Sequence, residues 1–177
     1  MAVSATTHNY LLFGAGNLTV GGVDIGATTD PVGFRVEQEV YFPNLNGARG
    51  PVTETGFKVR EVPYITVTVV EVRADVILWA VPGASLTSAV SSSCMCYGTV
   101  GCIPSTDYRD IVWTAVDCDV DTLTLSILDA IMDGNMEWSF NDEGEAQMTM
   151  TFMGTFDPAD ADARPWCWII QSDPAKI

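Results

Sequence analysis

Alternating apolar and polar side chains in residues 136–156 constrain the fold more than any other feature of the sequence. The stretch reads MEWSFNDEGEAQMTMTFMGTF, with the turn-forming residues NDEGE near its middle. Its apolar positions are Met136, Trp138, Phe140, Ala146, Met148, Met150, Phe152 and Phe156. A period of two places such side chains on one face of a strand and the polar ones on the other. The pattern therefore predicts an antiparallel hairpin with one buried face.

Two stretches in the first half of the chain also have strand patterns. Residues 32–42 place Phe34, Val36 and Val40 on one face, which we expect to be core. Residues 57–73 contain YITVTVVEVR, in which both faces are apolar, as is typical of a central strand. Shorter strands are predicted around Leu11 and at residues 17–20, 111–116 and 122–128.

One segment, residues 74–83, reads ADVILWAVPG and predicts a short helix. Asp75 is placed to cap its first turn, and Pro82 with Gly83 is expected to end it. The dominance of strand patterns over helical periods predicts a mainly β fold. We expect an antiparallel β-sandwich or partly closed barrel with one short flanking helix.

The chain is expected to form a single domain over residues 1–177. Residues 84–108, rich in Ser, Cys and Gly, and the tail 157–177 have no clear period, and both are interpreted as excursions or arms. No apolar run approaches the roughly 18 residues that cross a bilayer, so no membrane partner is predicted. The start, MAVSATTHNYLLF, lacks the features of a secretory signal, which predicts synthesis in a reducing cytoplasm and free thiols.

The net charge of the chain disfavours ordinary binding to nucleic acid or anionic lipid. The chain has eight Lys and Arg and 23 Asp and Glu, which gives a net charge of −15. A chain of this sign repels phosphate and has few cations to neutralise it.

Residues able to support catalysis or nucleotide binding are scarce. The single histidine, His8, lies in a Ser/Thr-rich leader with no third group to hold it in a triad. Gly14 and Gly16 resemble the start of a dinucleotide loop, but Thr19 stands where the third glycine belongs. We therefore predict that the protein is not an enzyme and binds no cofactor.

Two groups of candidate metal ligands fail on spacing. The first group consists of Cys94, Cys96 and Cys102, with Cys118 as a possible fourth thiol. One residue separates its first two cysteines, whereas the cysteine pairs of zinc sites are usually separated by two to four residues. Their redox state and role stay open. The aspartates of a calcium-like run are Asp117, Asp119 and Asp121, and this run lacks the Gly and Glu of a calcium loop. No metal site is predicted.

Glu37 and Glu39 share one face of the predicted strand 32–42, about 7 Å apart, a spacing that would also suit glycoside hydrolysis. Arg35 on the same strand, with Lys58 and Arg60 on the neighbouring strand, can pair with these carboxylates. A solvated charge ladder is the favoured interpretation.

The segment 44–56, NLNGARGPVTETG, is the most unusual feature between strands. A hairpin turns in two to five residues, whereas this tip has thirteen. Ordering so many backbone groups costs about 1–2 kcal/mol each, which a tip in water cannot offset. Burial of Leu45 and Val52 on another molecule would offset it, so the segment predicts a contact with a partner.

The sequence resembles the major tail tube protein of long-tailed (siphovirus-type) bacteriophages. The likeness runs in order through residues 14–72, 74–84, 138–158 and 164–170, as glycine turns, a long hairpin, a short helix and a closing acidic hairpin. Residues 84–108 match nothing in that pattern.

The resemblance implies a β-sandwich subunit of hexameric rings stacked into a virion tail tube, made in the host bacterial cytoplasm. Its implied partners are further copies of itself, other tail proteins at the tube ends, and double-stranded DNA that passes during ejection without specific binding. Residues 44–56 become the ring-stacking loop, and 1–10 and 157–177 become arms. The stacking residues are Leu45, Asn46, Arg49, Pro51, Val52 and Glu54. Glu37 and Glu39 are the expected lumen-facing charges, because acidic walls repel DNA.

Two alternatives stay open. An extracellular β-sandwich, such as a virion fibre or decoration protein, would bind carbohydrate or a receptor, with Trp166 and Trp168 as the aromatic pair. A needle subunit of a contractile secretion system would share a similar fold.

Overall fold

The computed structural model describes most of the chain after the first 15 residues. The described residues are 16–29, 31–71, 73–89, 92–96, 100–116, 122–134, 136–140, 144–157, 159 and 164–171. Several predictions from the sequence lie outside them: the strand around Leu11, the arm 1–10, and the interpretations of His8, Gly14, Cys118 and the aspartates at 117, 119 and 121.

The described strands form one antiparallel nine-stranded sheet and a separate two-stranded one, with one short helix, which confirms the mainly β prediction. The large sheet runs β2-β1-β7-β8-β10-β4-β3, with β11 also on β8 and β9 also on β10, and it is not closed. The elements are β1 (Gly16–Val20), β2 (Val23–Asp24), β3 (Gly33–Tyr41), β4 (Phe57–Val69), α1 (Ala74–Ala80), β5 (Ser85–Ala89), β6 (Ser92–Cys96), η2 (Ser105–Asp107), β7 (Arg109–Val116), β8 (Thr122–Met132), β9 (Glu137–Ser139), β10 (Gln147–Gly154) and β11 (Trp166–Gln171).

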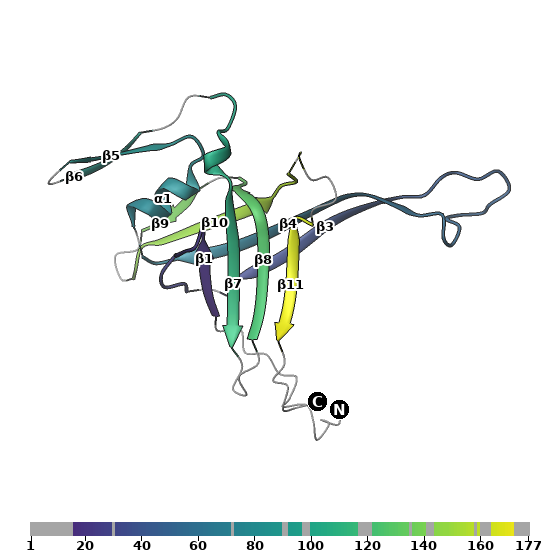
Figure 1. Cartoon of the computed structure of the whole chain (residues 1–177), viewed down its shortest axis with the longest axis horizontal. Coiled ribbons are helices and arrows are strands. Elements are labelled where there is room, and N and C mark those ends of the chain that lie inside the picture. Colours follow the sequence, from purple (N-terminus) through teal and green to yellow (C-terminus); the bar gives the residue numbers. More distant parts are fainter. Residues whose placement is uncertain are drawn as a thin grey trace, which may run out of the picture.

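The sheet bends into two layers that cross each other. Figure 1 shows β1, β7, β8 and β11 running across the direction of β3, β4 and β10. The end of β8 pairs with β10 and so connects the two layers, with Phe152 opposite Met132 and Gly154 opposite Ala130. Just before this junction the register between β7 and β8 shifts, and Asp129 takes a positive φ of 46°. A bulge of this kind bends a strand, and here it turns β8 from one layer to the other.

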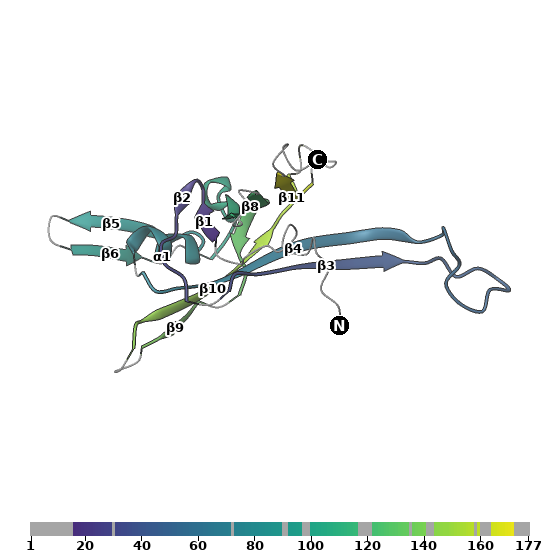
Figure 2. The same ribbon diagram turned by 90° about the horizontal axis from the view of Figure 1, so that it is seen from below.

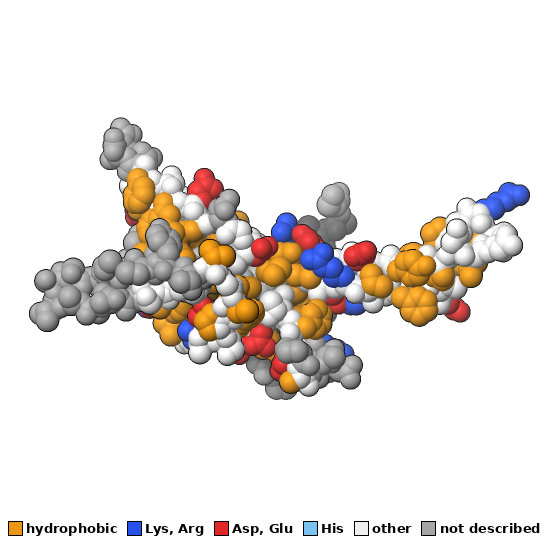
Figure 3. Space-filling view, turned by 90° about the horizontal axis from the view of Figure 1, so that it is seen from above, with side chains coloured by type: hydrophobic (Ala, Val, Ile, Leu, Met, Phe, Trp, Pro, Cys, Tyr) orange, Lys and Arg blue, Asp and Glu red, His pale blue; other side chains and the backbone are white. Residues whose placement is uncertain are grey.

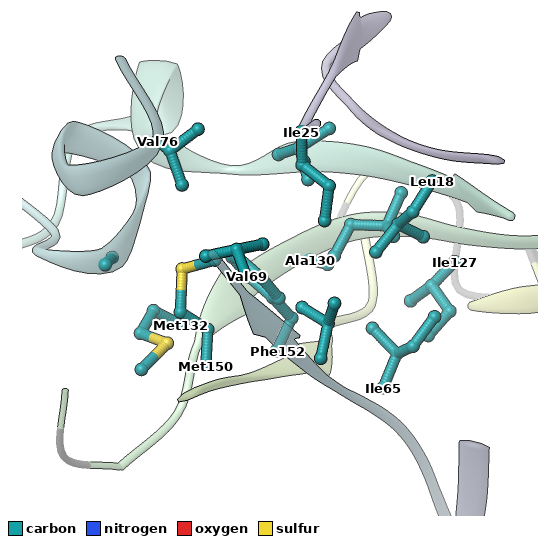
Figure 4. Packing of buried hydrophobic residues seen from close by; sticks show 14 of the residues in the cluster. Leu18, Ile25, Ile65, Val69, Val76, Ile127, Ala130, Met132, Met150 and Phe152 are labelled. Carbon is teal, nitrogen blue, oxygen red and sulfur yellow. The ribbon is translucent and has the colours of Figure 1, made fainter. Parts of the chain in front are cut away.

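The hydrophobic core fills the space between the layers and beneath α1 (Figure 4). The alternation predicted for residues 147–154 is confirmed: Met148, Met150 and Phe152 are buried, and the residues between them are partly exposed. In β4 residues on both faces are buried, among them Tyr64 and Ile65, and β4 lies between β3 and β10 in the sheet. The prediction of a central strand is confirmed.

The helix has the predicted position but not the predicted start. The residue preceding its first turn is Arg73, and no side chain caps it. Asp75 instead accepts hydrogen bonds from Arg73, with Nη2 to Oδ2 at 2.5 Å, so the expected cap is not formed. The pairing lowers the pKa of Asp75. After Val81 the chain leaves the helix at Pro82, and Gly83 has a φ of 76°, as expected for a helix stop.

Two segments without a clear sequence period contain strands. Within 84–108, β5 and β6 pair as a hairpin of their own that extends from the body of the molecule (Figure 1). Within 157–177, β11 pairs with β8 from Trp166 opposite Ile127 to Gln171 opposite Thr122. These six residues are therefore part of the main sheet and not an arm. Among the described residues no helix is long and apolar enough to cross a membrane.

Candidate functional site

The hairpin of β3 and β4 continues well beyond the body of the molecule (Figures 1 and 2). We call residues 40–60 the arm. The two strands keep pairing along its base, with Val40 opposite Lys58 and Tyr41 opposite Phe57. Glu39 pairs with Arg60, so Val59 is an extra residue in β4 and forms a bulge at the point where the arm begins.

The loop at the end of the arm is held by short-range hydrogen bonds. The Ala48 N–H donates to the Leu45 carbonyl at 3.1 Å. Thr55 donates twice to the Val52 carbonyl, from its N–H at 3.3 Å and its hydroxyl at 2.8 Å. Glu54 has a positive φ of 68°, an uncommon conformation for a residue with a side chain. The predicted stacking residues, Leu45, Asn46, Arg49, Pro51, Val52 and Glu54, are all exposed on this loop.

Large apolar side chains on the arm lie in solvent. The exposed fraction is 57% for Tyr41, 62% for Phe57 and 57% for Val59, and Val40, Phe42, Leu45 and Val52 are exposed too. Figure 3 shows hydrophobic side chains gathered along the arm. Val40 was expected in the core, and that expectation is wrong for the single subunit because β3 has left the body by this point. Apolar groups clustered in this way mark an interaction surface.

The strand register explains why the arm is apolar on both faces. Residues at the same level of β3 and β4 share a face, so Tyr41 and Phe57 lie on one side and Val40 on the other. Sequence reasoning did not single out Tyr41, Phe42, Phe57 and Val59 as exposed apolar residues. Their apolar character next to the long loop was the available signal.

A second surface is the face of β3, β4 and β10 that points away from the core. Thr66 and Thr151 share a hydrogen bond at 3.0 Å, and Thr68 and Thr149 share another at 3.1 Å. The alternation along β4 places Tyr64 on this same threonine face.

The register of β3 extends this threonine face with charged residues. Arg35 pairs with Tyr64, and its guanidinium carbon lies 4.3 Å from the centre of that ring. Glu37 and Glu39 follow on the same side of β3, and both are exposed. Arg35 Nη2 is 3.3 Å from Glu37 Oε1, so one of the two acids is partly neutralised. The predicted pair of carboxylates thus lies on one open sheet face, as its spacing indicated.

On the opposite side of β4, an aromatic cluster joins β11 to the base of the arm. Phe34 lies 5.5 Å from Trp166 and 6.3 Å from Trp168 between ring centres. Trp166 Nε1 donates to Glu61 Oε1 at 2.8 Å, and Lys58 pairs with the other oxygen of Glu61. The hydrogen bond from Lys58, followed by that from Trp166, lowers the pKa of Glu61. Trp166 therefore serves the packing of the layers, and only Trp168 is substantially exposed, at 45%.

Groups for metal chemistry do not converge in the part of the chain that the structure describes: no three His, Cys, Asp or Glu side chains there are placed to hold one ion. Cys102 and Cys167 are exposed free thiols. Cys94 and Cys96 lie on β6, opposite Thr87 and Ser85 of β5.

The fold resembles solved components of contractile injection systems. A chain of the sheath–tube complex of the extracellular contractile injection system PVC, in its extended state, gives a TM-score of 0.50 at 13% identity and covers 97% of this chain and 100% of that one. A chain of the anti-feeding prophage cap, the AFP tube terminating cap, gives 0.50 at 14%, covering 98% and 95%. No protein-family model and no curated protein sequence matches the chain. At such identities the likeness shows the fold, and this fold is tail-tube-like.

Proposed function

We propose that the protein is a structural subunit of a phage tail tube, in which hexameric rings stack around an acidic lumen. The observation that carries the proposal is the arm, a hairpin end that leaves the body with exposed apolar side chains on both of its faces. A single copy in water has nothing to cover these groups, and further copies in a stack would. The tail-tube-like fold supports this assignment.

The stacking contact is assigned to residues 44–56 at the end of the arm. Leu45 and Val52 are 42% and 37% exposed, so their burial on a neighbouring ring would contribute to association. At the two ends of the tube the same surfaces would meet other tail proteins.

The lumen wall is assigned to the threonine face with Glu37 and Glu39. The threonine hydroxyls of this face bond to one another, and Arg35 and Arg60 lie beside Glu37 and Glu39, so few of its groups are left to attract phosphate. Double-stranded DNA would therefore pass without specific binding. Such a protein would be part of the virion and act without chemistry of its own.

Deletion of residues 45–53 tests the stacking role. The deletion removes loop residues that lie outside the core, so the subunit should stay folded, with an unchanged circular dichroism spectrum and melting temperature. It should no longer form tubes, as seen by negative-stain electron microscopy. Tubes of normal length from the deletion variant would refute the assignment.

A subunit of a contractile injection system is the second candidate, because the two structural neighbours described above come from such systems. The lumen content of particles isolated from the producing cell separates the two. Nuclease-protected double-stranded DNA supports a virion tail, and protein cargo without DNA supports an injection system.

A further inference from the structure

The arm and the β9–β10 hairpin lie at opposite ends of strand β4. Phe57 at the start of β4 pairs with Tyr41 on the arm, whereas Val69 at its end pairs with Met148, next to β9. Twelve residue steps separate Phe57 from Val69, which corresponds to about 40 Å along a strand. Figures 1 and 2 both show the arm and the β9–β10 hairpin pointing in opposite directions.

The two ends differ in charge. The arm has three basic residues, Arg49, Lys58 and Arg60, and one acidic residue, Glu54, so its net charge is +2. The net charge of the whole chain is −15, so the remainder of the chain carries −17. Residues 136–156, which contain β9 and β10, have no Lys or Arg. Glu137 and Glu145 are exposed at this end. In Figure 3 basic side chains are seen at the tip of the arm and again near the body, where the arm begins.

The two ends also match in their apolar groups. At the β9–β10 end Phe140 is 76% exposed, and its ring stacks on Trp138 with centres 5.8 Å apart and planes 13° apart. On the arm Phe57 and Tyr41 are 62% and 57% exposed. Aromatic side chains of this kind are frequent anchors of protein interfaces.

We infer that the arm of one copy binds the β9–β10 hairpin of a second copy, head to tail. Arg49 and Arg60 would face Glu137 and Glu145, and the arm aromatics would face Phe140. This inference rests on the proposed function and names the surface that receives the arm. Because the two surfaces are different, the contact leaves a free arm at one end and a free hairpin at the other, so assembly has a direction and does not stop at a pair.

Reversing the charges of each surface tests the contact. One variant carries Arg49→Glu and Arg60→Glu, and the other carries Glu137→Lys and Glu145→Lys. Each alone places like charges opposite each other, so each should form at least about tenfold less sedimentable polymer than the wild type. An equimolar mixture should restore polymer, because the acidic arm of the first variant meets the basic hairpin of the second. The basic arm of the second variant likewise meets the acidic hairpin of the first.

The control for the first variant, Arg109→Glu with Arg164→Glu, makes the same change in net charge as Arg49→Glu with Arg60→Glu, at two exposed body residues, and should assemble as the wild type does. A single chain with all four interface substitutions should also polymerise with itself. Failure of both the mixture and the four-fold variant, while wild-type tubes form, would overturn the contact and leave the proposed function standing. Absence of wild-type tubes would overturn both.

Discussion

Trp166 Nε1 donates a hydrogen bond to Glu61 Oε1 at 2.8 Å, and this bond joins β11 in one layer to β4 in the other. The acceptor is a carboxylate, so the bond is stronger than one between neutral groups. Replacing Trp166 with Phe keeps an aromatic ring against Phe34 and removes the donor together with part of the indole ring. We expect a loss of about 1–2 kcal/mol in the free energy of unfolding, measured by urea denaturation.

Trp168→Phe is the matched control, because Trp168 is the more exposed ring of the same cluster. Its effect should stay within about 0.5 kcal/mol. Equal losses from the two substitutions would contradict a specific role for the indole N–H of Trp166.

The Glu61 carboxylate predicts a dependence of stability on pH. Its hydrogen bonds with Lys58 and Trp166 lower its pKa below the ordinary 4.5 in the folded state. A lowered folded pKa contributes stability that is fully present above pH 4.5 and is lost as the pH falls through the folded pKa. The difference in unfolding free energy between the wild type and Glu61→Gln should therefore be largest near neutral pH and shrink below pH 4.5. A difference that stays constant from pH 7 to pH 3 would contradict this account.

Asp129 provides a test of the corner in β8. Its positive φ of 46° disfavours branched side chains, and glycine adopts it without strain. Asp129→Val should cost about 1–2 kcal/mol of unfolding free energy or more, and Asp129→Gly should lie within about 0.5 kcal/mol of the wild type. Thermal denaturation of both variants measures this. A valine variant as stable as the glycine variant would show that the bend does not depend on this backbone conformation.

Glu37 and Glu39 provide a test of the lumen wall. Changing both to Lys should slow or block DNA ejection from assembled virions, because cations on the wall would bind passing phosphate. Tube formation should remain possible, since both side chains are exposed on a sheet face away from the stacking loop. Changing both to Gln removes the repulsion without adding attraction, so its effect on ejection kinetics should be smaller. Unchanged kinetics in the Lys variant would count against this wall.

The parts of the fold that sequence predicted well are those where local pattern and burial agree. Met148 and Met150 alternate with threonines and are buried, as is Phe152, and the β-branched run around Ile65 has buried residues on both of its faces. Both stretches lie in the body of the molecule, so the pattern of apolar residues follows the burial of their side chains.

The parts that sequence did not predict depend on long-range contacts or on the absence of a core. β11 is a short apolar run whose strand form comes from pairing with β8, which is distant in the sequence. β5 and β6 pair mainly with each other, so no core imposes a polarity pattern on them. Val40 follows the period of β3 but lies where the strand has already left the body.

The candidate site was predicted in part for a similar reason. The excess length of residues 44–56 indicates a contact surface, which stays a prediction, and the spacing of Glu37 and Glu39 predicts that they share one face, which the register of β3 confirms. The aromatic residues of the arm, Tyr41 and Phe57, are not distinguished from other strand residues by the sequence, because sequence alone does not show where a hairpin separates from its sheet.

Negative-stain electron microscopy of the purified wild-type protein at high concentration tests the central claim most directly. Identical copies that cover one another's arms should appear as stacked rings with a central hole. A uniform population of single subunits, at high concentration and within the particle that carries the protein, would contradict the account.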